Sequence, residues 1–303
     1  MNSGAPDVMR SHVRRATSSW QPSGNLRGTV EEAREVVRRA GRVVVLTGAG
    51  ISTGSGVPDY RGPSSIRATP MLYQEFISDP IARQRYWARN YQGWAKLSTA
   101  APNEGHLALS RWERQSHPGM LLGLVTQNVD GLHEAAGSRQ LITLHGRSAD
   151  VVCLQCGRVE ARVDLQERLR ELNPDVAMND RLGPAELRPD ADAEVEDWQD
   201  FSVPECRRCG GLLKPDVTFF GETVPKARVA AAFAWCDAAA AIVVAGSSLT
   251  VMSGLRFVRR MAKRGAPVII INHGATRGDN LATVRLDGDT SRLLPALVGP
   301  PRR

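Results

Sequence analysis

Short apolar runs recur along the chain, and each ends in small or polar residues. The clearest run, Val43–Leu46, leads directly into Thr47-Gly48-Ala49-Gly50. Leu121–Thr126, Ala240–Ala245 and Val268–Asn272 have a similar length and a similar ending. Such runs, with no alternation of polar residues, are typical of strands that are buried on both faces of a parallel sheet. The pattern therefore predicts a parallel sheet whose ligands bind beyond the carboxyl ends of its strands.

The segments between these runs have helical character. Glu31–Ala40 reads as a charged helix, and Gly41 fits the position at which a helix commonly ends. Strands that alternate with helices predict right-handed crossovers and an α/β fold, a doubly wound parallel-sheet, Rossmann-like domain. The region from about Val151 to Leu213 breaks this rhythm and is partly helical near Asp164–Leu172. It predicts a small inserted domain.

The length of 303 residues fits one large domain with a smaller satellite. We expect a flexible tail over residues 1–28, a Rossmann-like domain formed by 29–150 and 214–303, and a small cysteine-bearing domain over 151–213. A hydrophobic fraction of 42% with 23% charged residues is ordinary for a globular enzyme. No apolar run approaches the ~20 residues that a membrane-spanning helix needs, so no membrane association is expected.

The net charge is +7, but the basic residues are scattered and aromatic residues make up only 5%. This distribution argues against nucleic-acid binding, because no run interleaves stacking rings with cations. The N-terminal segment has no apolar signal core, which argues against secretion. Its arginines and serines resemble a mitochondrial transit peptide, but it shows no clear amphipathic stripe. A solvated basic tail and a cytoplasmic location are therefore favoured, with the mitochondrial matrix as the alternative.

Four of the five cysteines form two CxxC pairs, each followed by glycine. A CxxC turn places two sulfurs on one side of a tight turn, and four thiolates complete a tetrahedral site with no open position. We therefore expect one structural zinc ion in a zinc ribbon, held by Cys153, Cys156, Cys206 and Cys209. Disulfides are the competing interpretation, but there is no secretion signal. Cys236 is expected to be a buried free thiol. An acidic stretch between the pairs, Glu186–Asp200, argues against a nucleic-acid ribbon.

Three further motifs are ambiguous when each is taken alone. The glycine loop 48–56 could hold a pyrophosphate, but its spacing departs from GxGxxG and an ordinary turn fits as well. Asn128 and Asp130 follow a strand and could hold a ribose and a carboxamide, or could cap a helix. His145 could be structural, a metal ligand or a base.

Taken together and in order, these motifs resemble the sirtuin family. GAGISTGSGVPDYRG (48–62) is followed by TQNVDGLH (126–133), LHG (144–146), the two CxxC pairs and KPDVTFFGE (214–222). The resemblance runs from about Gly41 to Leu297. It implies an NAD-dependent protein lysine deacetylase, a sirtuin-type acyltransferase whose products are nicotinamide and O-acyl-ADP-ribose. The alternatives are a protein ADP-ribosyltransferase, a lipoamidase-type long-acyl deacylase and a non-catalytic NAD-sensing module.

The resemblance also assigns roles to residues of this chain. His145 would be the general base, with Asn128 and Asp130 completing the catalytic set. Acyl-lysine proteins would pair with the backbone of Val217, Phe219, Phe220, Gly221 and Glu222. NAD would be bound by a larger set of residues: Gly48, Ala49, Gly50, Ile51, Ser52, Asp59, Tyr60, Arg61, Gln127, Asn128, Asp130, Gly246, Ser247, Ser248, Asn272, His273, Gly274 and Thr290.

The finer resemblance is to the class II branch. It is carried by Arg83–Asn90, Leu165–Arg168 and Leu172–Pro174. That branch includes the mitochondrial sirtuin linked to lipoamide and other long acyl groups and to ADP-ribosyl transfer. Sirtuins that remove succinyl and malonyl groups have a tyrosine and an arginine after the glycine motif. Here the loop Pro63–Pro70 has an arginine but no tyrosine, so acidic acyl groups are not expected as substrates.

Overall fold

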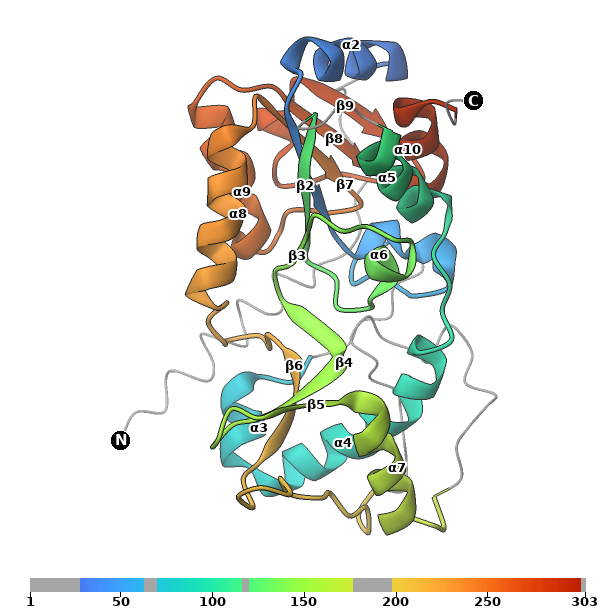
Figure 1. The fold of residues 1–303 in the computed structure, drawn as a ribbon, viewed down its shortest axis with the longest axis vertical. Coiled ribbons are helices and arrows are strands. Elements are labelled where there is room, and N and C mark those ends of the chain that lie inside the picture. The colour runs from blue at the N-terminus through green and yellow to red at the C-terminus, as the bar shows by residue number, and fades with distance from the viewer. Residues whose placement is uncertain (1–27, 63–69, 116–119, 177–197, 301–303) are drawn as a thin grey trace.

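The computed structural model describes residues 28–62, 70–115, 120–176 and 198–300. These residues form a large parallel sheet covered by helices and a smaller antiparallel sheet with helices of its own (Figure 1). The expected tail up to residue 27, residues 63–69 of the loop after the glycine motif, and residues 177–197 with most of the acidic stretch lie outside the described residues.

The larger sheet has six strands in the order β3-β2-β1-β7-β8-β9, and all neighbours are parallel. The chain adds strands outward from β1 on one side, and later from β7 on the other. The strand order therefore reverses between β1 and β7, and ligands of such sheets bind in the crevice at this reversal. The strands are β1 Val43–Thr47, β2 Leu121–Thr126, β3 Leu141–Thr143, β7 Ala241–Ala245, β8 Val268–Asn272 and β9 Val284–Asp287.

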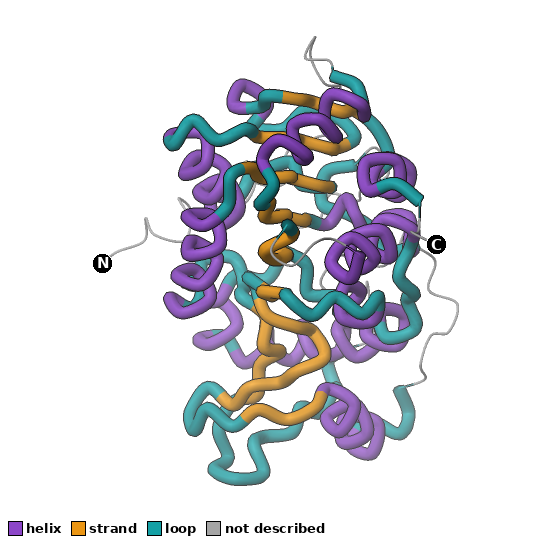
Figure 2. Tube along the Cα trace, turned by 45° about the horizontal axis from the view of Figure 1, so that its top comes forward, coloured by secondary structure: helices purple, strands orange, loops and turns teal. Residues whose placement is uncertain are grey.

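Alternate side chains of the central strands enter two different cores. In β1, Val43 and Val45 pack on one face, whereas Val44 and Leu46 pack on the other. Both faces are covered by helices, as Figures 1 and 2 show, and this double coverage explains the uninterrupted apolar runs. The first face carries α2 Val30–Ala40, α5 Glu104–Gln115 and α10 Thr290–Val298; the second carries α8 Lys226–Ala238 and α9 Met252–Lys263.

These observations confirm the predicted α/β class. The four predicted strands are present, and β7 begins one residue later than expected. Helix α2 begins with a capping box in which Thr29 and Glu32 bond each other's backbone N–H groups. It ends at Gly41, whose φ of 69° lies in the left-handed region. The expected buried thiol, Cys236, is 1% exposed within α8.

The smaller sheet is antiparallel, in the order β5-β4-β6. Its helices and strands share one aromatic core that includes Phe76, Trp87, Tyr91, Leu169 and Phe219. Two of these helices, α3 and α4, precede residue 151 in the chain, so the packing unit is larger than the cysteine segment. The expected domain boundaries stay a prediction. The elements are α3 Tyr73–Ser78, α4 Pro80–Leu97, β4 Gly146–Cys153, β5 Val159–Ala161, α7 Arg162–Leu172 and β6 Leu213–Val217.

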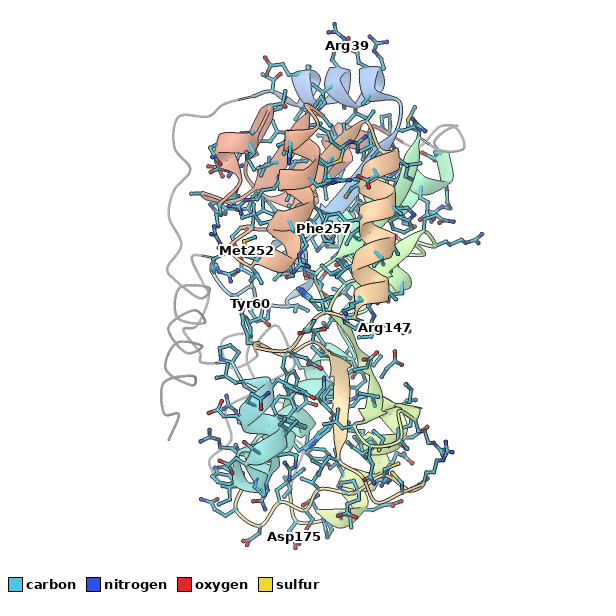
Figure 3. The ribbon with its side chains drawn as sticks, turned by 90° about the vertical axis from the view of Figure 1, so that its left-hand side faces the viewer. Arg39, Tyr60, Arg147, Asp175, Met252 and Phe257 are labelled. Carbon is cyan, nitrogen blue, oxygen red and sulfur yellow. The ribbon has the colours of Figure 1, made fainter. Side chains whose placement is uncertain are left out.

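The two sheets meet where β3 is followed almost at once by β4. Only Leu144 and His145 separate the strands, and the Thr218 N–H after β6 donates to the His145 carbonyl oxygen at 2.8 Å. The segment 146–217, which carries the smaller sheet, therefore leaves the large sheet and returns to it at one narrow neck. In Figure 3 the labelled Tyr60 and Met252 lie near this level, and Arg39 and Asp175 mark the opposite ends of the molecule. Among the described residues, no helix combines the length and the apolar character needed to span a membrane.

The neck gives a stability prediction. Gly146 has φ +87°, and a Cβ added there would collide with the backbone carbonyl of Asp216. Gly41 has φ +69°, but a Cβ there would meet nothing within 4 Å. We expect Gly41→Ala to lower the free energy of unfolding by about 1 kcal/mol through backbone strain alone. Gly146→Ala should cost roughly 3 kcal/mol or more, because the backbone must also move. Urea unfolding measures both, and equal costs would contradict the close packing at the neck.

Candidate active site

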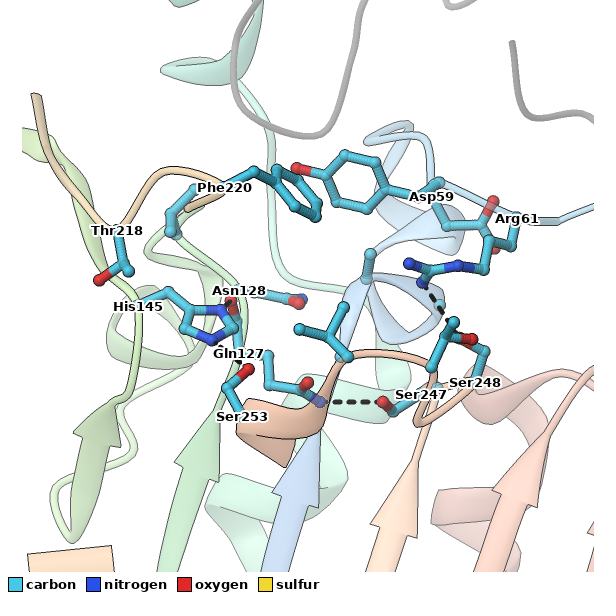
Figure 4. Close-up of a pocket in the computed structure, with 18 of the residues that line it drawn as sticks. Asp59, Arg61, Gln127, Asn128, His145, Thr218, Phe220, Ser247, Ser248 and Ser253 are labelled. Carbon is cyan, nitrogen blue, oxygen red and sulfur yellow. Dashed lines mark hydrogen bonds between the residues drawn. The ribbon is translucent and has the colours of Figure 1, made fainter. Parts of the chain in front are cut away.

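The described residues enclose a cavity of about 700 Å³ at the strand-order reversal. Its walls come from the carboxyl ends of β1, β2, β7 and β8 and from the segment after β6 (Figure 4). The cavity therefore lies between the two sheets, and every element around it follows a strand whose register is fixed by its neighbours.

The glycine loop after β1 packs backbone against backbone on the loop after β7. The Gly50 N–H donates to the Gly246 carbonyl oxygen at 2.8 Å. A Cβ on Gly50 would lie 3.0 Å from Gly246, and one on Gly246 would collide with the Ile51 backbone. Only glycine permits this approach. It places the backbone of residues 48–50 at the wall of the cavity, while the Gly48 and Gly50 N–H groups are held by the Ala245 and Gly246 carbonyl oxygens.

Arg61 is the cation of this part of the cavity. Its Nη1 donates to Ser248 Oγ at 3.0 Å, whereas its buried Nε and Nη2 have no partner within the described residues. Burial lowers the pKa of Arg61 from its ordinary value, which the nearby Tyr60 and Asp59 oppose. A buried guanidinium with two free donors fits a pyrophosphate, because it is planar and forms paired hydrogen bonds. Asp59 bonds the Gly62 N–H at 2.6 Å and so fixes the turn around Arg61.

Asp130 joins the glycine loop to the strand end of β2. Its Oδ2 accepts from Ser52 Oγ at 2.6 Å and from Asn128 Nδ2 at 3.3 Å. Its Oδ1 accepts from the Leu132 N–H at 3.0 Å, where the short helix α6 (Leu132–Ala135) begins. Asp130 can therefore cap α6 and face the cavity at the same time, because its two carboxylate oxygens have different partners.

Gln127 links the strand ends of β1, β2 and β7. Its Nε2 donates to the Thr47 carbonyl oxygen at 3.2 Å and to Ser247 Oγ at 2.9 Å. A Cβ on Gly254 would lie 2.5 Å from Gln127 Oε1, so the start of α9 presses on this amide. Gln127 is thus held from three sides.

His145 lies at the neck with both ring nitrogens engaged. Nδ1 lies 2.9 Å from the Gln127 carbonyl oxygen, and Nε2 lies 2.9 Å from Ser253 Oγ. A carbonyl oxygen only accepts, so we infer that Nδ1 carries the proton. Burial lowers the pKa of His145 to about 4, the Gln127 carbonyl opposes this shift, and Arg256 and Arg228 add to it. The imidazole is neutral at pH 7, as a base must be.

The segment after β6 forms the wall opposite the glycine loop. All five of its residues named from the sequence, Val217, Phe219, Phe220, Gly221 and Glu222, line the cavity. The Phe220 carbonyl oxygen accepts from the Tyr73 N–H at 2.9 Å. Glu222 accepts from the Phe219 N–H at 2.8 Å and from Lys214 Nζ at 3.1 Å, and Lys214 is only 2% exposed. A buried ion pair therefore fixes the turn.

The four paired cysteines gather beyond the neck, at the strand ends of the smaller sheet. Their sulfurs lie within 4.8 Å of one another; Cys153 and Cys209 are 3.6 Å apart, and Cys156 and Cys206 are 3.8 Å apart. A tetrahedral zinc ion with Zn–S near 2.3 Å separates its sulfurs by about 3.8 Å, whereas a disulfide needs about 2 Å. All four are free thiols, and they fit a closed structural zinc site.

Most of the residues expected to bind NAD line the cavity, but three do not. Ile51 is fully buried in the core behind the glycine loop. Gly274 bonds Asp287 through its N–H and Asn272 through its carbonyl. Thr290 donates to the Gly50 carbonyl oxygen at 3.2 Å from the far side of the loop. These three positions support the lining and do not form it. The lining residues of the expected set are Gly48, Ala49, Gly50, Ser52, Asp59, Tyr60, Arg61, Gln127, Asn128, Asp130, Gly246, Ser247, Ser248, Asn272 and His273.

Several residues of the site were not predicted. Asn103 donates to the Ile51 carbonyl oxygen at 2.8 Å and to Ser55 Oγ at 2.9 Å, which holds the glycine loop. His106 lies near Ser52, with its ring 4.8 Å from that of buried His133. The position of Asn103 directly before a helix could have been recognised in the sequence, because asparagine is a common helix N-cap. Ser253 and Arg256, on α9, also line the cavity, and no motif marks them.

Comparison with known proteins places these features in a family. Residues 48–253 match the model of the Sir2 family. The chain is 51% identical to NAD-dependent protein deacetylase 1 of Mycobacterium avium (strain 104), over 89% of this chain and 96% of that protein. It is 44% identical to the mitochondrial NAD-dependent protein lipoamidase sirtuin-4 of Bos taurus, over 89% of this chain and 86% of that protein. A solved structure described as Sir2-p53 peptide-NAD+ has a TM-score of 0.70 at 28% identity. The match covers 88% of this chain and 96% of that chain.

Zinc is expected to stabilise the smaller sheet. We expect one zinc ion per purified chain, lost in Cys206→Ser, with a fall in the free energy of unfolding of about 3 kcal/mol or more. Cys236→Ala is the matched control, because it removes a buried thiol far from the cluster and should keep the metal. Elemental analysis and urea unfolding measure both effects. Full stability after complete removal of zinc would show that the cluster is not structural.

The lowered pKa values of two histidines predict a loss of stability in acid. Burial lowers the pKa of both His106 and His145 to about 4, against about 6.5 in the unfolded chain. Below pH 6.5 the unfolded state binds more protons, so this stabilisation is complete above pH 6.5 and is lost as the pH falls through 4. It amounts to about 3 kcal/mol for each histidine. Urea unfolding at several pH values from 7.5 to 4.5 gives the free energy of unfolding as a function of pH. This free energy should fall less steeply with decreasing pH in His145→Gln than in the unaltered protein. An equal fall in both proteins would contradict the lowered pKa.

Proposed function

Because this chain belongs to the Sir2 family, we propose that it is an NAD-dependent protein lysine deacylase, which releases nicotinamide and O-acyl-ADP-ribose. One observation carries the proposal. His145 is a neutral, partly buried imidazole that lies between the glycine loop and the segment 217–222 at the same cavity. The cavity thus brings a cofactor wall, a substrate wall and a base together.

The cofactor wall fits NAD by its donors. The free donors of Arg61 suit the pyrophosphate, which the side-chain-free glycine backbone of residues 48–50 would allow to approach closely, and Ser247 and Ser248 suit a ribose. Asn272 and His273 line the cavity at the end of β8, where they would contact the adenosine. Asp130 and Asn128 would hold the carboxamide and the second ribose. When bound, NAD would supply the ribose carbon that loses nicotinamide and the ribose hydroxyl that receives the acyl group.

The substrate wall fits an extended acyl-lysine peptide. Residues 217–222 continue from β6, and their backbone could add a peptide strand by hydrogen bonding. The turn is already fixed by Lys214 and Glu222, so little ordering would be needed on binding. Acylated proteins are therefore the proposed partners. A cytoplasmic location belongs to the same proposal, because reducing compartments keep zinc-binding cysteines as thiols.

His145 would act by accepting the proton of a ribose hydroxyl. Its ring is oriented by Gln127, and desolvation keeps it neutral and able to take up a proton. Asp130 would hold Ser52 and Asn128 in place on the other side of the reacting carbon. ADP-ribosyl transfer to a protein nucleophile uses the same loss of nicotinamide, but it does not require this base.

The test is mass spectrometry of acyl-lysine peptides, from acetyl through lipoyl to succinyl, incubated with and without NAD. We expect loss of acetyl or longer apolar acyl groups only with NAD, and a fall of at least about 10²-fold for His145→Ala because a general base is removed. Arg147→Ala is the control: it lies two residues away, pairs with Glu134 and Asp150, and does not line the cavity.

Three outcomes would overturn this proposal. Full deacylation by His145→Ala would remove the base from its role. ADP-ribose attached to protein, with no O-acyl-ADP-ribose, would identify a transferase. Binding of NAD without any turnover on the panel would leave a sensing module.

A further inference from the structure

Ser253 is a serine at the active-site cavity that no sequence motif marks. It is the second residue of α9, it lines the cavity, and it is 7% exposed. Its Oγ lies 2.9 Å from His145 Nε2, and the two side chains point toward one another in Figure 4. The next residue, Gly254, packs against Gln127, which orients the same imidazole. The start of α9 therefore contacts the base on one side and its orienting group on the other.

Hydrogen-bond chemistry fixes the direction of this contact. Nδ1 must donate to the Gln127 carbonyl, so a neutral imidazole has its only lone pair at Nε2. Ser253 then donates its hydroxyl proton to Nε2. Neither ring nitrogen has a free lone pair, and a base in this state cannot take a proton directly from the cofactor.

We propose that Ser253 relays the proton between the ribose hydroxyl of bound NAD and His145. This inference rests on the proposed function and names the group through which the base works. The ribose O–H bond breaks and its proton passes to Ser253 Oγ, while the Ser253 O–H proton passes to His145 Nε2. One O–H bond and one N–H bond form as two O–H bonds break. The ribose oxygen becomes the nucleophile, and the imidazole becomes the imidazolium.

The surroundings of Ser253 suit this exchange. Its place in the first turn of a 12-residue helix puts the oxygen near the positive end of the helix dipole, which favours electron density there. A serine hydroxyl is both donor and acceptor, so it can pass a proton without a net change in its own charge. The residue is nearly buried, so water has little access to replace it.

The first experiment separates the proton transfer from the earlier loss of nicotinamide. Exchange of labelled nicotinamide into NAD, in the presence of acyl peptide, requires only that earlier step. We expect Ser253→Ala to keep this exchange within about twofold and to lose deacylation by roughly 10²-fold, as for the loss of a general acid or base. Ser253→Thr, which keeps the hydroxyl, should recover at least a tenth of the lost rate.

A second measurement needs no turnover. Nitrogen-15 NMR of the unliganded, unaltered protein should show His145 as the Nδ1–H tautomer, with Nε2 accepting a hydrogen bond. In Ser253→Ala the Nε2 resonance should move toward that of an unbonded ring nitrogen. This measurement can overturn the proposal even if the alanine variant folds poorly, because the tautomer is read from the unaltered protein.

Each remaining result counts against the relay. Undiminished deacylation by Ser253→Ala would show that the serine swings aside. Loss of exchange and deacylation together would assign it to cofactor binding, and a threonine variant as slow as alanine would assign it to packing. An Nε2–H tautomer would reverse the hydrogen bond. If the unaltered protein neither exchanges nicotinamide nor deacylates, the proposed function itself fails, which is distinct from failure of the relay alone.

Discussion

The contact between Gly50 and Gly246 is the constraint on which the active site depends. It joins the loops after β1 and β7 at the place where the strand order reverses, so two segments about two hundred residues apart share one backbone surface. Because no side chain separates them, the backbone of residues 48–50 can line the cavity directly. Asn103 and Thr290 brace the same loop from behind. The strand order of the sheet thus sets the position of the cavity, and the side chains that line it set its chemistry.

The second organising influence is the exclusion of water around polar groups. His133 is fully buried, which lowers its pKa well below the ordinary value, and His106 and His145 follow the same trend. Burial keeps these rings neutral, so they can accept and donate hydrogen bonds without the cost of a buried charge. Arg61 is the contrast: it is a cation at the cavity with two donors that have no partner within the described residues.

Residue patterns predicted the parts of the molecule that local chemistry determines. The apolar strands, the helix ending at Gly41 and the four-cysteine cluster each follow from a short stretch of sequence. Strand β9 was missed because Arg285 interrupts its apolar character; in the fold, Asp279 and backbone carbonyls surround that guanidinium. Ser253 was missed for a different reason. Its role arises from a helix that meets a histidine 108 positions earlier in the chain, and no local pattern encodes that meeting.

The narrow neck has a consequence for how this chain can vary. The smaller sheet leaves at His145 and returns at Thr218, and these two residues are hydrogen bonded to each other. The segment between them is a loop in the topological sense, because its two ends are already held together. The entropy of closing a loop rises only slowly with its length, so insertions beyond the neck cost little. Evolution could therefore lengthen or shorten the stretch between the cysteine pairs while the base and the substrate segment kept their separation.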